Sequence, residues 1–247
     1  MLKMNGFLVL MVIGVVLASG CARPESAPQA DEVLKEVTGI EEIGGKYNLT
    51  LVDTEVTVGN RSSSMKMIRY VKDGVVVEPD MMLPDYVRPG LDWIRENTLD
   101  DVVVFCWWDH GHMIRAYGMR DVVVDGPSRE ILVTTVSKYV GMSVDEIECP
   151  DCVSHDVILD VSGALLGEDS KGLLEVMDKY GASVFYVQNK DADKSFAFYA
   201  SLGEEPKEPD SEEFLGTVAG RGARAEEIDG LELAYSDEVA RVYLVDE

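Results

Sequence analysis

The sequence predicts an α/β fold with a mostly parallel sheet flanked by helices, a small N-terminal β-rich part and a C-terminal hairpin. Short apolar runs at residues 102–105 and 184–187 lack polar alternation, as strands buried on both faces do. Segments with helical periodicity separate these runs, and such an alternation indicates a parallel sheet. Apolar residues make up 46% and charged residues 28% of the 247 residues, a composition typical of globular proteins.

The first 20 residues are organised like a secretory signal peptide. Lys3 precedes an apolar run at residues 7–17, and small residues follow it. The run is shorter than the ~20 residues that a membrane-spanning helix needs. Cys21 comes next and resembles the cysteine of a lipobox, although Leu17 stands one position before the place of the usual leucine. We therefore expect lipidation of Cys21; an ordinary signal peptide or an uncleaved anchor that happens to contain a cysteine is the alternative.

Residues 21–31 are rich in Pro, Ala and polar side chains, which predicts a flexible tether between the lipid and the folded part. The protein is accordingly expected on the extracytoplasmic face of the cell membrane, anchored by lipid. Residues 32–80 are the small β-rich part, to which we assign no function. Alternating apolar and polar residues at 47–58 predict a half-buried strand, and Asp73-Gly74 between two apolar runs predicts a hairpin.

Residues 81–247 are expected to form the α/β domain. Helices are predicted at residues 91–97, 112–118, 128–139, 170–180 and 191–202, strands at 102–105, 122–124 and 184–187, and the closing hairpin at 231–235 and 239–245. Ligands of such sheets bind at the carboxyl ends of the strands. The segment that begins at Trp107 follows one strand directly, and Asp191 follows another, so both occupy that position.

The charge balance excludes one class of partner. The chain has 46 Asp and Glu residues against 22 Lys and Arg residues, a net charge of −24. Such a surface repels nucleic acid and is not attracted to anionic lipid headgroups, so we expect no nucleic-acid partner.

Two cysteines lie close together in the sequence. An oxidising exterior favours a disulfide between Cys149 and Cys152. The alternative is half of a metal site with His155, but the sequence offers no second Cys/His pair to complete four ligands, so we expect no metal. Cys106 ends an apolar strand and is expected to be a buried small hydrophobe.

Trp107, Trp108 and Asp109 suggest a small polar pocket. Core packing would place large aromatic residues within periodic segments, not side by side at the end of a strand. An indole N–H only donates hydrogen bonds, and an ionised carboxylate only accepts them. Together they suit a group that does both, such as the hydroxyl of a small alcohol side chain, and apolar walls would strengthen these bonds.

The sequence Trp-Trp-Asp-His-Gly at residues 107–111 resembles the WWDYG signature of oligosaccharyltransferase catalytic subunits, which transfer lipid-linked glycans to Asn in Asn-X-Ser/Thr. The resemblance extends over residues 81–247 and implies that Trp107, Trp108 and Asp109 hold the Ser/Thr hydroxyl of an acceptor peptide. His110 replaces the usual Tyr at a position that we expect to tolerate change if it mainly supports the loop, and Gly111 completes the signature.

Asp191, Lys194 and Phe198 match the spacing of the family's second signature, which implies that they face the tryptophans. Phe198 replaces an Ile or Met and is expected to narrow the pocket in favour of Ser over Thr. The alternative for Asp191 and Lys194 is an ion pair on a solvated helix face.

The expected function is recognition of the Asn-X-Ser/Thr hydroxyl, as an accessory or orphan module of N-glycosylation that binds acceptor peptides. The family's catalytic acids lie in a multi-spanning membrane domain that we expect to be missing, so we assign no catalytic residue and no cofactor to this chain. One alternative is a subunit of a split oligosaccharyltransferase that works with a separate multi-spanning membrane partner. Another is a structural surface lipoprotein that has lost the pocket.

Overall fold

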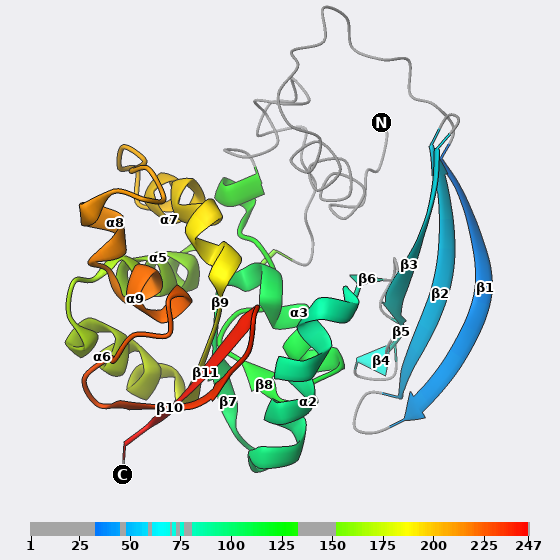
Figure 1. Cartoon of the computed structure of the whole chain (residues 1–247), viewed down its shortest axis with the longest axis horizontal. Coiled ribbons are helices and arrows are strands. Elements are labelled where there is room, and N and C mark those ends of the chain that lie inside the picture. Colours follow the sequence, from blue (N-terminus) through cyan, green and yellow to red (C-terminus); the bar gives the residue numbers. More distant parts are fainter. Residues whose placement is uncertain are drawn as a thin grey trace, which may run out of the picture. The chain divides into compact units, whose positions relative to one another are not determined.

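The computed structural model describes residues 33–44, 48–58, 61–69, 71–72, 75–76, 81–132 and 152–246. The chain divides into two compact units, residues 1–85 and residues 86–247, which we call the first and the second unit (Figure 1). The predicted signal peptide, the tether and Cys21 lie outside the described residues. Within the part of the chain that is described, no helix is long and apolar enough to cross a membrane.

The first unit contains an antiparallel sheet in the order β1-β2-β3-β6. Its strands are β1 (Val33–Gly44), β2 (Leu49–Val58), β3 (Arg61–Arg69) and β6 (Met81–Met82). β2 lies where the alternation predicts a strand. β1 is not predicted, because a register shift between Val37 and Gly39 interrupts its alternation. The expected hairpin is formed by β4 (Val71–Lys72) and β5 (Val75–Val76).

The second unit is built on a five-stranded sheet in the order β10-β11-β9-β7-β8. Its strands are β7 (Val103–Phe105), β8 (Asp121–Val122), β9 (Ala182–Gln188), β10 (Leu231–Ser236) and β11 (Ala240–Val245). β7 pairs in parallel with both β8 and β9. β11 is antiparallel to its neighbours β9 and β10, so it alone runs against the other four strands. The predicted α/β fold with a closing hairpin is confirmed.

Helices cover both faces of this sheet (Figure 1). Gly90 of α2 (Arg88–Asn97) lies against Tyr186 of β9, whereas Gly222 of α9 (Val218–Ala223) lies against Phe185 of the same strand. Adjacent residues of a strand point to opposite faces, so α2 and α9 pack on opposite sides. The other helical elements of the described residues are η1 (Asp85–Val87), α3 (Trp108–Ala116), α5 (His155–Leu166), α6 (Ser170–Tyr180), η3 (Asn189–Lys194), α7 (Ser195–Ser201) and α8 (Glu212–Leu215).

Several helices differ from their predictions. The helix expected from residue 112 begins four residues earlier, at Trp108, so most of the tryptophan-containing segment is helical. α5, α8 and α9 are not predicted; α5 contains the run Val-Ile-Leu-Asp-Val, which reads like a strand. The helix expected from residue 191 starts as the 3₁₀ turn η3 and continues as α7. Of the helix expected at 128–139, residues 129–132 are helical, Ser128 precedes them without helical structure, and residues 133–139 lie outside the described residues.

The core of the second unit lies between the sheet and α5, α6, α7 and α9. The rings of Phe105 and Phe185 meet edge to face across β7 and β9, with centroids 5.9 Å apart. Phe185 in turn stacks on Tyr243 of β11 at 5.7 Å. Aromatic contacts of this kind add to the free energy gained by burial. The three central strands are therefore fixed to one another at their buried face.

The cysteines are placed only in part. Cys106 is a free, buried thiol, as predicted. Cys152 is disulfide-bonded, but Cys149 lies outside the described residues, so their pairing stays a prediction. The Nδ1 atom of His155 lies 2.9 Å from the hydroxyl of Ser128. That ring nitrogen is therefore bound to a hydroxyl.

Candidate functional site

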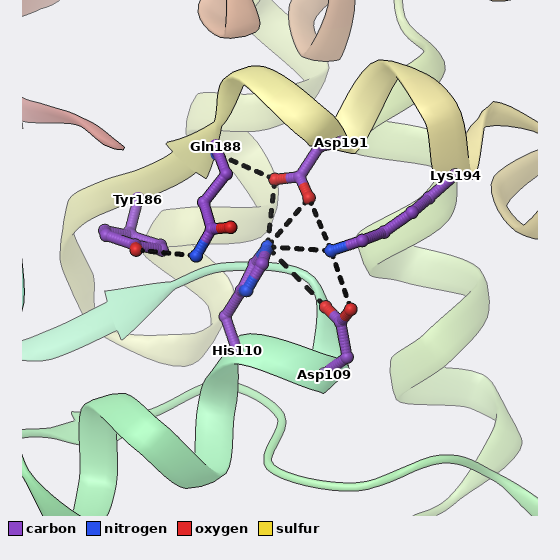
Figure 2. A network of polar contacts seen from close by, with 6 residues as sticks. All are labelled: Asp109, His110, Tyr186, Gln188, Asp191 and Lys194. Atoms are coloured by element: carbon purple, nitrogen blue, oxygen red, sulfur yellow. Dashed lines mark hydrogen bonds and ion pairs between the residues drawn. The ribbon is translucent and has the colours of Figure 1, made fainter. Parts of the chain in front are cut away.

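Two neighbouring parallel strands carry the candidate site at their carboxyl ends. β7 ends at Phe105, and α3 begins three residues later with Trp108, Asp109 and His110 in its first turn. β9 ends at Gln188, and η3 follows at once. Because β7 and β9 pair in parallel, their ends lie at the same edge of the sheet. Segments about 80 residues apart in the sequence therefore meet there (Figure 2).

Lys194 joins the two segments. Its ammonium lies 2.7 Å from Oδ2 of Asp109 and 2.8 Å from Oδ1 of Asp191 (Figure 2). The Asp191 side chain is only 3% exposed. A solvated ion pair on a helix face is therefore the wrong interpretation of Asp191 and Lys194. Burial opposes the charge of Lys194, but the two carboxylates prevail and raise its pKa, so the side chain stays an ammonium.

Asp191 also organises the start of η3. Its Oδ2 accepts a hydrogen bond from the backbone N–H of Gln188 at 2.8 Å, and the Gln188 side chain completes the reciprocal capping box. The amide of Gln188 donates to the hydroxyl of Tyr186 at 2.9 Å. Sequence reasoning missed Gln188 and Tyr186. A capping box is readable as a polar residue at the end of a buried strand with an acid three positions later, and that signal is present here.

His110 is part of this network. Its Nε2 lies 2.8 Å and 3.0 Å from the two carboxylate oxygens of Asp191, and the ring meets that of Tyr186 edge to face at 5.4 Å. The residue is 2% exposed. The expectation that position 110 mainly supports a loop is therefore wrong, and its tolerance of change stays a prediction. The position lies in a helix and contacts a buried carboxylate on another element.

Trp107 and Phe198 form the apolar side of the site. The Trp107 residue is 2% exposed and belongs to the core. Its ring meets that of Phe198 edge to face, with centroids 4.7 Å apart. Phe198 is fully buried, so it acts on the site by fixing Trp107. The expected effect of Phe198 on the choice between Ser and Thr stays a prediction.

Gly111 has a packing role that the structure makes plain. A Cβ at this position would collide with the carbonyl oxygen of Val124 and lie 2.6 Å from the Cα of Asp125. α3 can thus approach the segment after β8 only with glycine here. Arg115, one turn later, forms an ion pair with Asp125 across the same contact.

Three buried polar atoms at the site have no hydrogen-bond partner: Nε1 of Trp108, Oδ1 of Asp109 and Nδ1 of His110. A buried polar group without a partner costs about 1–3 kcal/mol, so such groups are uncommon. The first is a donor and the second an acceptor, and they belong to adjacent residues. A group that donates and accepts at once, such as a hydroxyl, suits this pair.

Asp109, His110 and Asp191 each offer an atom that could bind a metal ion, and these atoms lie within 4.8 Å of one another. The ammonium of Lys194 already contacts both carboxylates. A metal ion would have to displace it, and a neighbouring ammonium repels a cation. The group is therefore an ion-pair network.

No protein-family model matches the chain. Among curated proteins, the dolichyl-diphosphooligosaccharide–protein glycosyltransferase subunit STT3B of Oryza sativa subsp. japonica is 31% identical over 111 residues, which are 43% of this chain and 15% of the relative. The dolichyl-phosphooligosaccharide-protein glycotransferase of Methanocaldococcus jannaschii is 36% identical over 89 residues, 32% of this chain and 9% of the relative. The matched part of the chain is homologous to part of these glycosyltransferases. It spans less than a fifth of their length.

Solved structures give a weaker likeness. The C-terminal globular domain of an oligosaccharyltransferase from Archaeoglobus fulgidus is similar at a TM-score of 0.49 and 13% identity, with 67% of this chain and 100% of that chain covered. A complex of the archaeal oligosaccharyltransferase from the same organism with an inhibitory peptide and a dolichol-phosphate is similar at a TM-score of 0.41, with 64% and 24% covered.

Proposed function

We propose that the second unit recognises the Ser/Thr hydroxyl of Asn-X-Ser/Thr acceptor sequences and takes part in protein N-glycosylation. One observation carries this proposal. The buried N–H of Trp108 and the buried Oδ1 of Asp109 are an unpartnered donor and an unpartnered acceptor on adjacent residues. The indole would donate to the hydroxyl oxygen, and the hydroxyl would donate to the carboxylate.

The surroundings of this pair support recognition. Lys194 holds Oδ2 of Asp109 at 2.7 Å and leaves Oδ1 for the ligand. Trp107, fixed from behind by Phe198, gives an apolar wall. Hydrogen bonds are stronger where water is excluded, and a site held in place by its own contacts loses less freedom on binding.

The homologous proteins supply the biological setting. Their names describe glycosyltransferases that act on proteins with dolichyl-linked oligosaccharides. We carry this role over to the chain as acceptor recognition without transfer, because we assign no catalytic residue or cofactor to the residues of the site. A multi-spanning membrane protein is the partner that would supply the chemistry.

Peptide titration of the full chain tests this function. We would follow its amide chemical shifts with three peptides that differ only in Thr, Ser or Ala at the third position of the sequon. A tripeptide has roughly 20 non-hydrogen atoms, and at about −0.3 kcal/mol per atom its binding free energy is limited to about −6 kcal/mol. The Kd is then roughly 50 μM at best, so titration up to millimolar peptide is needed.

The Thr and Ser peptides should shift resonances of α3 and η3, and the Ala peptide should not, because the two buried groups would stay unpartnered. Asp109→Asn should abolish the difference, whereas Asp156→Asn, on the exposed start of α5, should keep it. An equal response to the Ala peptide would show that the pocket does not read a hydroxyl. Glycan transfer by the chain alone would reveal catalytic residues in it.

We further propose that Cys21 is the lipidated N-terminus of the mature protein, on the extracytoplasmic face of the membrane. The small residues 18–20 and the apolar run before them support this. One acyl chain binds a membrane only weakly, so stable anchoring needs a second chain or a partner. Mass spectrometry of the native protein should show loss of residues 1–20 and added lipid mass. A mature protein that retains Met1 would contradict it.

A further inference from the structure

The unexplained group of the site is the imidazole of His110. Its Nε2 lies within 3.0 Å of both oxygens of Asp191, and a carboxylate only accepts hydrogen bonds. Nε2 therefore carries a hydrogen. The ammonium of Lys194, 3.3 Å from the same nitrogen, then faces a donor and cannot donate to it. The hydrogens of Lys194 go to the carboxylates of Asp109 and Asp191 instead.

These assignments form a chain of contacts that ends at the ligand. His110 and the backbone of Gln188 fix Asp191, and Asp191 fixes Lys194. Lys194 in turn holds Oδ2 of Asp109, which leaves Oδ1 unpartnered. His110 also lies near that free oxygen, because its Nε2 is 3.6 Å from Oδ1 of Asp109. The imidazole thus acts on Asp109 by two routes.

We propose that His110 is a positioning residue that makes hydroxyl recognition depend on pH: the neutral ring leaves Oδ1 of Asp109 to the ligand, and the protonated ring competes for that oxygen. Protonation adds a hydrogen at Nδ1 and a positive charge to the ring. The charge attracts Oδ1 of Asp109 at 3.6 Å and repels the ammonium of Lys194 at 3.3 Å. Both effects move Asp109 away from the arrangement that binds a hydroxyl. This inference rests on the proposed function of the site.

Two other titratable groups beside the ring keep a single protonation state. Burial raises the pKa of Cys106, just before α3, and that of Tyr186, on β9, so both stay neutral. The carboxylates of Asp109 and Asp191 and the ammonium of Lys194 leave one net negative charge beside the ring. Histidine is the side chain whose charge ordinarily changes between about pH 5 and pH 8.

The test compares the full-length wild type with His110→Gln, whose amide N–H still donates to Asp191 but does not titrate. Affinity for the Thr peptide is measured at about pH 8 and about pH 5.5. Wild type should bind about fivefold more weakly at the lower pH, and His110→Gln should bind equally at both. His155→Gln, which changes the imidazole at the start of α5 that is bonded through Nδ1 to Ser128, is the control and should behave like wild type.

Ring-nitrogen NMR of wild type, with each imidazole assigned through its own backbone resonances, gives a readout that does not depend on the variant. It should show the Nε2–H form at about pH 8; the Nδ1–H form would overturn the inference even if the variant fails to fold. Hydroxyl-dependent binding with the same pH profile in wild type and variant would also overturn it and leave the proposed function intact. Absence of hydroxyl-dependent binding at both pH values would overturn the proposed function, and this inference with it.

Discussion

Asp191 combines a structural and a functional task in one carboxylate. It caps η3 through the backbone of Gln188, and it holds Lys194 and His110 at the site. Burial raises its pKa, but His110, Lys194 and the backbone hydrogen bond outweigh burial and lower it well below its ordinary value. The folded protein thus binds fewer protons at this group than the unfolded chain does.

We expect Asp191→Asn to lower the free energy of unfolding at neutral pH by about 3 kcal/mol, because Lys194 and His110 lose a buried negative partner. A lowered pKa gives stability that is fully present above the unfolded value, near 4, and is lost as the pH falls toward the folded value. Urea unfolding between about pH 7 and pH 3 should therefore show a smaller loss of stability for Asp191→Asn than for wild type. Equal losses would contradict the assignment; the exposed Asp156→Asn is the control.

Most of the site could be predicted from the sequence and its resemblance to a known family. Trp107, Trp108, Asp109 and Asp191 are singled out by their places after two buried strands, and Lys194 by its match to the family's second signature; the structure brings them to one edge of the sheet. The role of His110 does not follow from the sequence. It depends on the register of β7 against β9, which decides that the imidazole meets Asp191 and Tyr186. Register between strands 80 residues apart is a tertiary property that no local pattern encodes.

At the scale of the element, α3 is placed by how closely it approaches the segment after β8. Gly111 permits that approach, because its missing Cβ is the atom that would meet the carbonyl of Val124. This close approach fixes the axis of α3 and, with it, the direction in which the side chains of Asp109 and His110 point. A helix interior ordinarily disfavours glycine. Packing outweighs propensity here.

Gly111→Ala should destabilise the protein by about 2 kcal/mol or more, because the methyl group meets backbone, which must shift. Gly163→Ala on α5 is the matched control, since no atom lies within 4 Å of its added Cβ. That control should stabilise the protein by about 0.5–1 kcal/mol through helix propensity. Thermal unfolding of both variants measures the difference. A loss of stability in Gly163→Ala as well would show that the loss in Gly111→Ala is not caused by the close backbone contact alone.

The start of α5 is tied covalently to the rest of the chain through Cys152. We predict that its partner is Cys149. Alkylation of unfolded, unreduced protein should modify the free thiol of Cys106 but neither Cys149 nor Cys152, and mapping by mass spectrometry should find these two in one linked peptide. After reduction all three should react. A cross-linked peptide that contains Cys21 in place of Cys149 would refute the pairing.

Elements with a distinct sequence pattern, either alternation or a short apolar run, were predicted well, and those without such a pattern were missed. The closing hairpin of β10 and β11 and the buried strands β7 and β9 appear where the pattern places them. α5 was missed because Val157, Ile158 and Val161 are β-branched and most of the helix is apolar, so its sequence shows little amphipathic contrast. It is helical because it packs against α6 and α7. Packing of this kind is not visible in the local sequence.

At the scale of the whole molecule, the dominant property is charge. The net charge is −24 over 247 residues, and the excess negative side chains repel one another more strongly in the compact folded state than in the extended unfolded chain. Salt screens charges that are separated by more than about 10 Å at 0.1 M, whereas close buried pairs such as Asp191 with Lys194 are screened much less. Added salt should thus weaken the repulsion between surface charges and leave the buried ion pairs of the site intact.

We therefore expect the melting temperature of the full chain to rise by several degrees between about 0.02 M and 0.5 M NaCl, because about 1 kcal/mol shifts a domain of this size by about 2–4 °C. Differential scanning calorimetry in both salts measures this rise. The Asp191→Asn variant should show the same increment from a lower starting point. A fall of the melting temperature with salt would mean that surface ion pairs outweigh the repulsion.

The contact between Trp107 and Phe198 also allows the assembly of the site to be followed by tryptophan fluorescence. The two rings belong to segments about 90 residues apart, and they meet only after β7 has paired with β9 and α7 has docked. Contacts between such distant segments require closure of a long loop, so they form late in folding. The emission of Trp107 should therefore change in the last kinetic phase, after most helical signal has appeared. With Trp93 replaced by Phe, the remaining tryptophans are both at the site, and the time course of their fluorescence measures when the site has formed.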